Sequence, residues 1–197
     1  LSSQKVGATV ADDVTRKAFI AVIVSLVVMF VYIAIRFRRC QYGLSSIICL
    51  THDTLLVIGM YSLFNNILPF TMEVNQSFIA AVLTIIGYSI NNTVVIFDRV
   101  RENVNLFPKK GWKERFNSAN NSTLLRSINT SGTTIVVLLA IFIFGGETIR
   151  GFVFALLVGM IAGTFSSLFI ASPLAYALFK GKQYDEQLEQ VADKKRK

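Results

Sequence analysis

The sequence predicts an all-α polytopic membrane protein with five transmembrane helices. Hydrophobic residues make up 53% of the 197 residues and charged residues only 16%, whereas soluble domains carry about a quarter charged residues. The charges are clustered and leave five long stretches almost free of them. Each stretch is near or above the roughly 20 residues needed to cross ~30 Å of hydrocarbon. The net charge of +8 is therefore interpreted by its position along the chain and not as a sign of nucleic-acid binding.

The five predicted spans follow one another with short connections. They cover about 18–36, 44–64, 75–97, 123–144 and 152–179. The polar stretch 1–17 before the first span lacks the pattern of a signal peptide, and we expect it to be the end of an extracytoplasmic domain or a linker. The last span is long enough to tilt in the membrane or to extend beyond it.

Two polar segments lie on the inner side of the predicted spans. Segment 98–122 is expected to be a partly helical cytoplasmic loop that lies along the membrane surface, with Trp112 and Phe116 as interfacial anchors. Segment 180–197 has the composition of a solvated cytoplasmic tail, helical at first and basic at its end. Both segments are therefore assigned to the cytoplasm.

The distribution of lysine and arginine predicts this orientation. If the N-terminal end lies outside, the inner segments 36–43, 98–126 and 180–197 hold three, seven and six basic residues. The outer side holds four, namely Lys5, Arg16, Lys17 and Arg150. Because basic residues are enriched on the cytoplasmic side, the N-terminal end is expected outside and the C-terminal tail in the cytoplasm.

Three groups of polar residues lie inside the spans, where such side chains usually face partners or water. His52 and Asp53 lie near the middle of the second span, with Asp53 about 14 Å deep at the helical rise per residue. Asn91 and Asn92 lie near the inner end of the third span, with Asn92 about 7 Å deep. Arg126 lies about 5 Å inside the fourth span. Asn92 and Arg126 could therefore meet if these two spans are neighbours.

Most of these residues also have a purely structural interpretation. Arg126 could extend its side chain to the membrane interface, and Asn91 and Asn92 could form ordinary hydrogen bonds between helices. His52 could bond a carbonyl group of a neighbouring helix. Asp53 is harder to explain in this way, because carboxyl groups in the middle of a membrane are rare and usually functional. We therefore expect Asp53 to take part in an ion or proton pathway.

Two further patterns follow the faces of single spans. Arg126, Thr130 and Thr134 are spaced four residues apart, which suits either bonds between helices or a wetted pathway. Small residues recur at every fourth position of the last span, namely Ala155, Gly159, Gly163, Ser167 and Ala171. Since such a face lets helices approach closely, Gly159 and Gly163 are predicted to be packing residues.

Motifs for catalysis and cofactor binding are absent from the sequence. It contains no nucleotide-binding loop, zincin motif, Cys/His metal cluster or nucleophile elbow. Intramembrane catalysis needs paired aspartates, a serine–histidine pair or a metal set, and only one aspartate lies in the middle of a span. Cys40 and Cys49 have no motif spacing. We therefore expect no enzymatic activity, no cofactor and no metal.

Several motifs resemble the SecF half of the SecD/SecF family of protein-export membrane proteins. The stretch "GYSINNTVVIFDRVREN" at 87–103 resembles the family signature, and four others agree with it in order and spacing: "THDT", "LLRSINTSGTT", "FGGETIRGF" and "GMIAGTFSSLFIASPLA". The stretch "QKVGATVADD" is similar to the segment that leaves the large extracytoplasmic domain of that family. The resemblance covers residues 5 to about 180.

The resemblance implies the fold of RND-type transporters, in which a six-span SecF half pairs with a homologous SecD half, as a separate chain or fused. It also implies that this chain lacks the first span and the extracytoplasmic domain of its half. Members associate with the SecYEG translocon in the bacterial or archaeal plasma (inner) membrane and use a proton gradient, or sodium in some, to promote protein export. The implied partners are SecD, SecYEG, a translocating preprotein, H⁺ or Na⁺ and membrane lipid, but no nucleic acid.

The chain departs from the family pattern at Asn92. The family has an aspartate at this position, whereas His52, Asp53 and Arg126 match it. An amide is nearly isosteric with a carboxyl group but carries neither a proton nor a charge. The protein is therefore an engineered variant, a natural variant whose ion is carried by Asp53 or by the partner half, or a scaffold subunit that transports no ion. Another RND-type exporter, of lipid or drug, is a further alternative.

Overall fold

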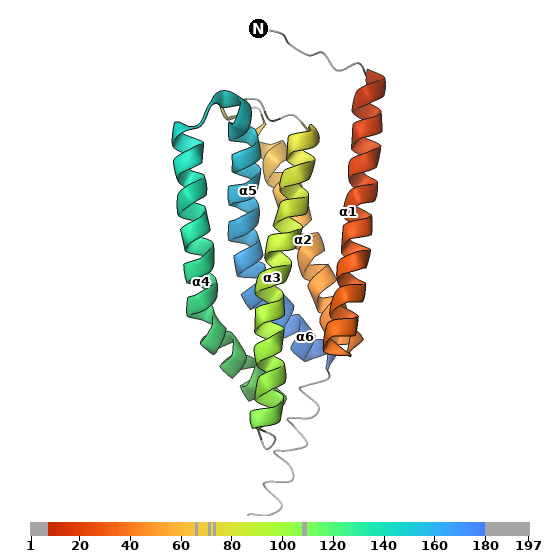
Figure 1. Ribbon diagram of the computed structural model, residues 1–197, viewed down its shortest axis with the longest axis vertical. Coiled ribbons are helices and arrows are strands. Elements are labelled where there is room, and N and C mark those ends of the chain that lie inside the picture. The colour runs from red at the N-terminus through yellow and green to blue at the C-terminus, as the bar shows by residue number, and fades with distance from the viewer. Residues whose placement is uncertain (1–7, 66, 71, 73, 108–109, 180–197) are drawn as a thin grey trace, which may run out of the picture.

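The computed structural model describes residues 8–65, 67–70, 72, 74–107 and 110–179 as a bundle of long helices (Figure 1). The elements are α1 Ala8–Phe37, α2 Cys40–Phe64, α3 Gln76–Leu106, α4 Trp112–Phe144, α5 Glu147–Ser166, the π-helical segment η1 Ser167–Ala171, and α6 Ser172–Leu178. Five helical stretches in the described part are long and apolar enough to cross a membrane, the last of them running through α5, η1 and α6. The predicted all-α fold with five membrane-crossing helices is confirmed.

The helices end where the sequence supplies a change of backbone geometry. Between α1 and α2 the chain reverses at Arg38, which has a φ of 54°. The side chain of Asn75 caps α3 by accepting a hydrogen bond of 3.1 Å from the amide of Phe78, as N-cap asparagines do. Between α4 and α5 the chain turns at Gly145, where an added Cβ would collide with the carbonyl oxygen of Ile141.

The centre of the bundle is α5, which packs against α2, α3 and α4. All five small residues of the predicted stripe, which runs from α5 into η1, are buried. An added Cβ at Gly159 would lie 2.8 Å from Cγ2 of Ile85 on α3, and closer still to Cγ1 and Cδ1 of that side chain. Helices α3 and α5 therefore approach closely at Gly159, as small residues allow.

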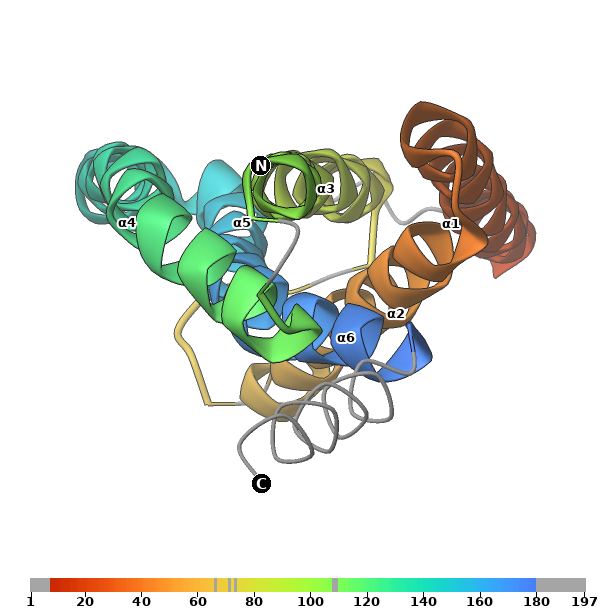
Figure 2. The same ribbon diagram turned by 90° about the horizontal axis from the view of Figure 1, so that it is seen from below.

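Helix α1 lies at the edge of the bundle, beside α2 and α3 (Figures 1 and 2). Most of its large apolar side chains are exposed, among them Phe19, Val24 and Val27. In a membrane these side chains face hydrocarbon, so their exposure is consistent with a helix that contacts lipid along most of its surface.

Most of the expected segment 98–122 is helical. Helix α3 continues to Leu106 and α4 already begins at Trp112, so both helices extend beyond the limits of the predicted spans. The first part of α4 slants across the end of the bundle towards α6 (Figure 2). Hydropathy marks the apolar stretch and not the end of the helix, so a helix can continue beyond a predicted span.

The predicted interfacial anchoring by Phe116 does not agree with the burial of its side chain. Phe116 is buried, with its ring 6.0 Å from that of Tyr176 and 6.3 Å from that of Phe179. Trp112 stacks on Phe179 with 5.2 Å between ring centroids. These aromatic residues therefore attach the start of α4 to the end of α6 instead of anchoring a loop in the interface.

Candidate ion-coupling site

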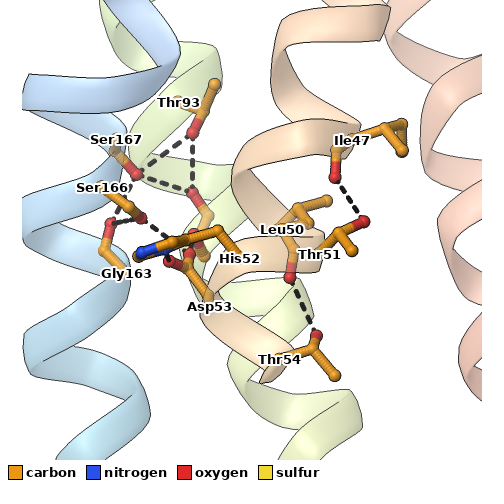
Figure 3. A network of polar contacts seen from close by, with 11 residues as sticks. Ile47, Leu50, Thr51, His52, Asp53, Thr54, Thr93, Gly163, Ser166 and Ser167 are labelled. Carbon is orange, nitrogen blue, oxygen red and sulfur yellow. Dashed lines mark hydrogen bonds and ion pairs between the residues drawn. The ribbon is translucent and has the colours of Figure 1, made fainter. Parts of the chain in front are cut away.

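Asp53 occupies the point where three helices meet. Its side chain projects from α2 and is only 1% exposed. One carboxylate oxygen, Oδ2, accepts a hydrogen bond of 2.7 Å from Ser89 on α3 and one of 2.8 Å from Ser166 at the end of α5 (Figure 3). Two donors from separate helices compensate for the burial of this carboxyl group. The expected role of Asp53 in an ion or proton pathway stays a prediction.

The second carboxylate oxygen of Asp53 faces His52. Nδ1 of His52 lies 3.2 Å from Oδ1, and the imidazole side chain is 43% exposed, so it connects the buried carboxyl group with the outer surface of α2. Among the described residues no lysine or arginine pairs with Asp53. The neighbouring residues His52 and Asp53 thus form one unit that can hold a proton or a small cation.

Further hydroxyl groups lie beside Asp53. Each of them is within hydrogen-bonding distance of two possible acceptors. The hydroxyl of Ser166 lies 2.8 Å from Oδ2 of Asp53 and 3.2 Å from the carbonyl oxygen of Gly163. The hydroxyl of Ser167 lies 2.6 Å from the same carbonyl oxygen and 3.3 Å from that of Ser89. Thr93 can donate to Ser167 or to the carbonyl of Ser89, both at 3.1 Å. Since each hydroxyl has one hydrogen, the network has more than one hydrogen-bonding arrangement.

The last span departs from α-helical geometry beside this network. The π-helical segment η1 begins at Ser167, directly after Ser166, and Pro173 follows it at the start of α6. Proline lacks an amide donor and widens or bends the helix before it. The side-chain amide of Asn120 on α4 donates to the carbonyl oxygen of Leu168 at 3.2 Å. π-Helical segments often mark functional sites, and this one is linked through hydrogen bonds to α3 and α4.

The two asparagines of α3 have different environments. Asn91 is exposed, whereas Asn92 is 5% exposed and its Nδ2 has no hydrogen-bond partner. Successive residues point about 100° apart around an α-helix, and in the register of α3 Asn92 faces the interior while Asn91 faces outwards. Asn92 is therefore a buried amide with an unpaired donor, not a residue in an ordinary helix-to-helix hydrogen bond.

Arg126 and Asn92 lie at similar depth but are not joined. Hydrogen bonds of 3.1 Å join α3 to α4 above and below this level, from Tyr88 to Ser131 and from Arg99 to Ser122. Both Arg126 and Thr130 point to the exposed side of α4. In the described part of the chain no hydrogen bond or ion pair of Arg126 is recorded. The predicted neighbourhood of the two helices exists, but the side chains point in different directions.

Sequence reasoning missed the serines that contact Asp53. Ser89 and Ser166 are completely buried, as is Ser167. An added Cβ at Gly163 would lie 3.0 Å from Cβ of Ser89 and 3.6 Å from Oδ2 of Asp53, so the small-residue stripe also brings the serines to the carboxyl group. The only signal in the sequence was the position of Ser166 beside that stripe.

Comparisons with known proteins place this architecture in a family. Residues 1–181 match the family model described as protein export membrane protein SecD/SecF, C-terminal. The chain is 49% identical over 173 residues to protein translocase subunit SecF of Rhodothermus marinus, covering 88% of this chain and 56% of that protein. It is 42% identical over 188 residues to the protein of the same name from Sebaldella termitidis, covering 95% of this chain and 59% of that protein.

A solved structure has the same arrangement of helices. The chain resembles a crystal structure of SecDF in the super-membrane-facing form with a TM-score of 0.77 and 38% identity. The match covers 93% of this chain and 24% of that chain. The chain thus spans little more than half the length of the two SecF relatives and about a quarter of the SecDF chain.

Proposed function

The chain belongs to the SecD/SecF family of protein export membrane proteins, and on this premise we propose that it is the membrane part of an accessory subunit of the Sec protein translocase. The subunit uses the proton or sodium gradient to promote export of preproteins through SecYEG. The match to the family model over residues 1–181 is the observation that carries the proposal. The description of this family supports a role in protein export.

The proposal includes a second, homologous half as the partner of this bundle, either a SecD chain or a fused segment. It is supported by polar side chains on the outer sides of neighbouring helices. Arg126, Asn129, Thr130 and Thr133 on α4 and Asn91 on α3 are all exposed. Polar groups at membrane depth are costly when they face hydrocarbon, so this surface favours a protein partner with polar groups of its own.

We also propose that the N-terminal end of α1 lies outside the cell and the C-terminal tail in the cytoplasm. The arginines at the opposite end of the bundle support this orientation. These arginines lie at helix ends: Arg36 in the last turn of α1, Arg39 just before α2, Arg99 and Arg101 near the end of α3, and Arg115 in the first turns of α4. Because basic residues favour the cytoplasmic side, this end is assigned to the cytoplasm.

Coupling in the proposal begins with the charge of Asp53. The ionised carboxylate accepts the hydrogens of Ser89 and Ser166, as in the geometry described above. After protonation Asp53 itself becomes a donor, and the hydroxyl of Ser166 turns to its other acceptor, the carbonyl oxygen of Gly163. Proton uptake therefore changes the bonds at the junction of α5 and η1, which links α2, α3 and α4. Helix packing changes with it and moves the outer domain of the full-length protein.

The proposed function is tested by preprotein translocation into inverted membrane vesicles. Vesicles that contain the full-length protein with SecYEG are compared with vesicles that lack it, with and without an ionophore. We expect the protein to stimulate translocation only while the ion gradient is present, because the gradient supplies the energy. Equal stimulation after the gradient has been collapsed would show a scaffold and not an ion-driven subunit.

Asn92→Asp tests whether position 92 can take part in coupling. The new carboxyl group replaces an amide whose donor has no partner, at the depth of Arg126 on the adjacent helix. We expect ion flux in vesicles and gradient-driven export to increase by about two-fold or more, because a buried ionisable group adds a proton-binding site. Asn91→Asp, on the exposed side of the same turn, is the control and should change neither. If Asn92→Asp also changes neither, position 92 is not a coupling site in this protein.

A further inference from the structure

An apolar crevice lies between α1, α2 and α3, away from Asp53. Its volume is about 340 Å³. Its lining includes Phe19, Val22 and Leu26 of α1, Leu55 of α2, and Phe78 and Val82 of α3. The crevice lies on the side of α1 that faces α2 and α3. Helix α1 itself lies at the edge of the bundle (Figure 2). The crevice is therefore next to the hydrocarbon of the membrane.

The lining offers no free polar group to a ligand. Its two hydroxyl side chains, Thr51 and Thr54, both donate to backbone carbonyl oxygens of their own helix, those of Ile47 and Leu50, at 2.8 Å (Figure 3). Their remaining surface towards the crevice is apolar. A cavity of this kind does not stabilise water, which needs polar partners, so it suits a hydrocarbon chain.

The shape of the crevice suits a chain that enters from one membrane surface. On α1 its lining runs from Ala18 to Leu26, which corresponds to about 12 Å along the helix axis. Val74, just before α3, and Phe78 in its first turn also line it, so the crevice lies near the end of the bundle where the membrane-spanning part of α1 begins. The crevice therefore extends from the level of the lipid headgroups towards the middle of one leaflet.

An arginine lies on α1 just before the residues that line the crevice. The membrane-spanning part of α1 begins at Arg16, which is exposed. Arg16 lies three residues before Phe19 and seven before Ile23, so it continues the helix face that lines the crevice. Arginine binds phosphate oxygens through two parallel hydrogen bonds.

We propose that this crevice binds one acyl chain of an anionic phospholipid, whose phosphate is held by Arg16. The apolar lining selects a hydrocarbon chain, and the guanidinium group at its opening selects a negatively charged headgroup. A bound lipid of this kind fills the space between α1 and the rest of the bundle. It gives the peripheral helix a second contact besides its direct packing on α2 and α3.

The experiment uses the full-length protein in phosphatidylcholine vesicles that contain a trace of phosphatidylglycerol with a photoreactive acyl chain. After illumination, mass spectrometry identifies the labelled peptides. We expect labelling within residues 18–26, 51–58 and 74–82, and competition by unlabelled phosphatidylglycerol but not by additional phosphatidylcholine. Labelling spread evenly over the exposed faces of all helices would show unspecific lipid contact and overturn the proposal.

Two tryptophan variants at similar depth on α1 separate the crevice from general contact with lipid. Val22→Trp fills the crevice and is expected to lower labelling by about ten-fold, as overfilling excludes a ligand from a packed site. Ile20→Trp lies outside the lining and should label like the unchanged protein. Equal labelling of the two variants would overturn the proposal, as would a crosslink from the crevice to another protein segment.

Arg16→Gln should remove the advantage of phosphatidylglycerol over phosphatidylcholine, and an unchanged preference would contradict the role of Arg16.

Discussion

Asp53→Asn is expected to abolish the gradient-dependent part of export while the fold is retained. The amide oxygen can still accept hydrogen bonds from Ser89 and Ser166, because it has two lone pairs. The amide nitrogen can face His52. The side chain therefore keeps its packing and loses only the ability to bind a proton or a cation. We expect gradient-driven translocation in vesicles to fall by about ten-fold or more, since the buried carboxyl group carries the coupling charge.

The control for this substitution is Asp98→Asn. Asp98 lies on α3 near the end of the bundle, where it forms a partly exposed ion pair of 3.4 Å with Arg36. Exposed ion pairs contribute little to stability, so this variant should export at the normal rate. Thermal unfolding of both purified full-length variants in detergent checks that the fold is retained. Normal gradient-driven export by Asp53→Asn would refute the coupling role of Asp53 in this half.

The five membrane-crossing helices could be predicted because hydropathy measures the property that the bilayer selects. Their ends could not be predicted in the same way. The amphipathic part of α3 up to Leu106 and the first turns of α4 from Trp112 have too many polar residues for a span, yet they continue the helices. Their stability comes from packing outside the apolar stretch, for example from the buried ring of Phe116. A hydropathy profile contains no information about such packing.

The charged residues of the candidate site could be singled out from the sequence, but their contacts could not. A carboxyl group in the middle of a span is rare enough to single out Asp53 from the sequence alone. Its partners Ser89 and Ser166 are of a type that occurs throughout membrane helices, and only the register of three packed helices brings them together. In the same way the depth of Arg126 could be predicted, but its direction around α4 could not.

Gly159→Ala is expected to separate α3 from α5 and to destabilise the bundle. The added methyl group would collide with Cγ1, Cγ2 and Cδ1 of Ile85, so the whole side chain must move and not only its flexible end. Overpacking a well-packed interior costs about 1–3 kcal/mol, and we expect the free energy of unfolding to fall by this amount. Export should fall as well, because α5 holds Ser166 against Asp53 from the same interface. The measurement is unfolding of the full-length protein in mixed micelles, followed by translocation in vesicles.

A rescue variant and a second glycine separate this collision from a general effect of alanine. Ile85→Ala removes the side chain in the way, so the double variant Gly159→Ala with Ile85→Ala should be more stable than the sum of the two single effects predicts, as a positive coupling in a double-mutant cycle. Gly132→Ala lies within α4, where an added Cβ meets nothing within 4 Å, and should leave stability unchanged or raise it by up to about 1 kcal/mol. If Gly159→Ala behaves like Gly132→Ala, the close contact between α3 and α5 does not limit stability. If instead the double variant shows no coupling, Ile85 is not the group that the methyl displaces. A positive coupling together with restored export would show that the spacing of these two helices positions the hydroxyl groups around Asp53.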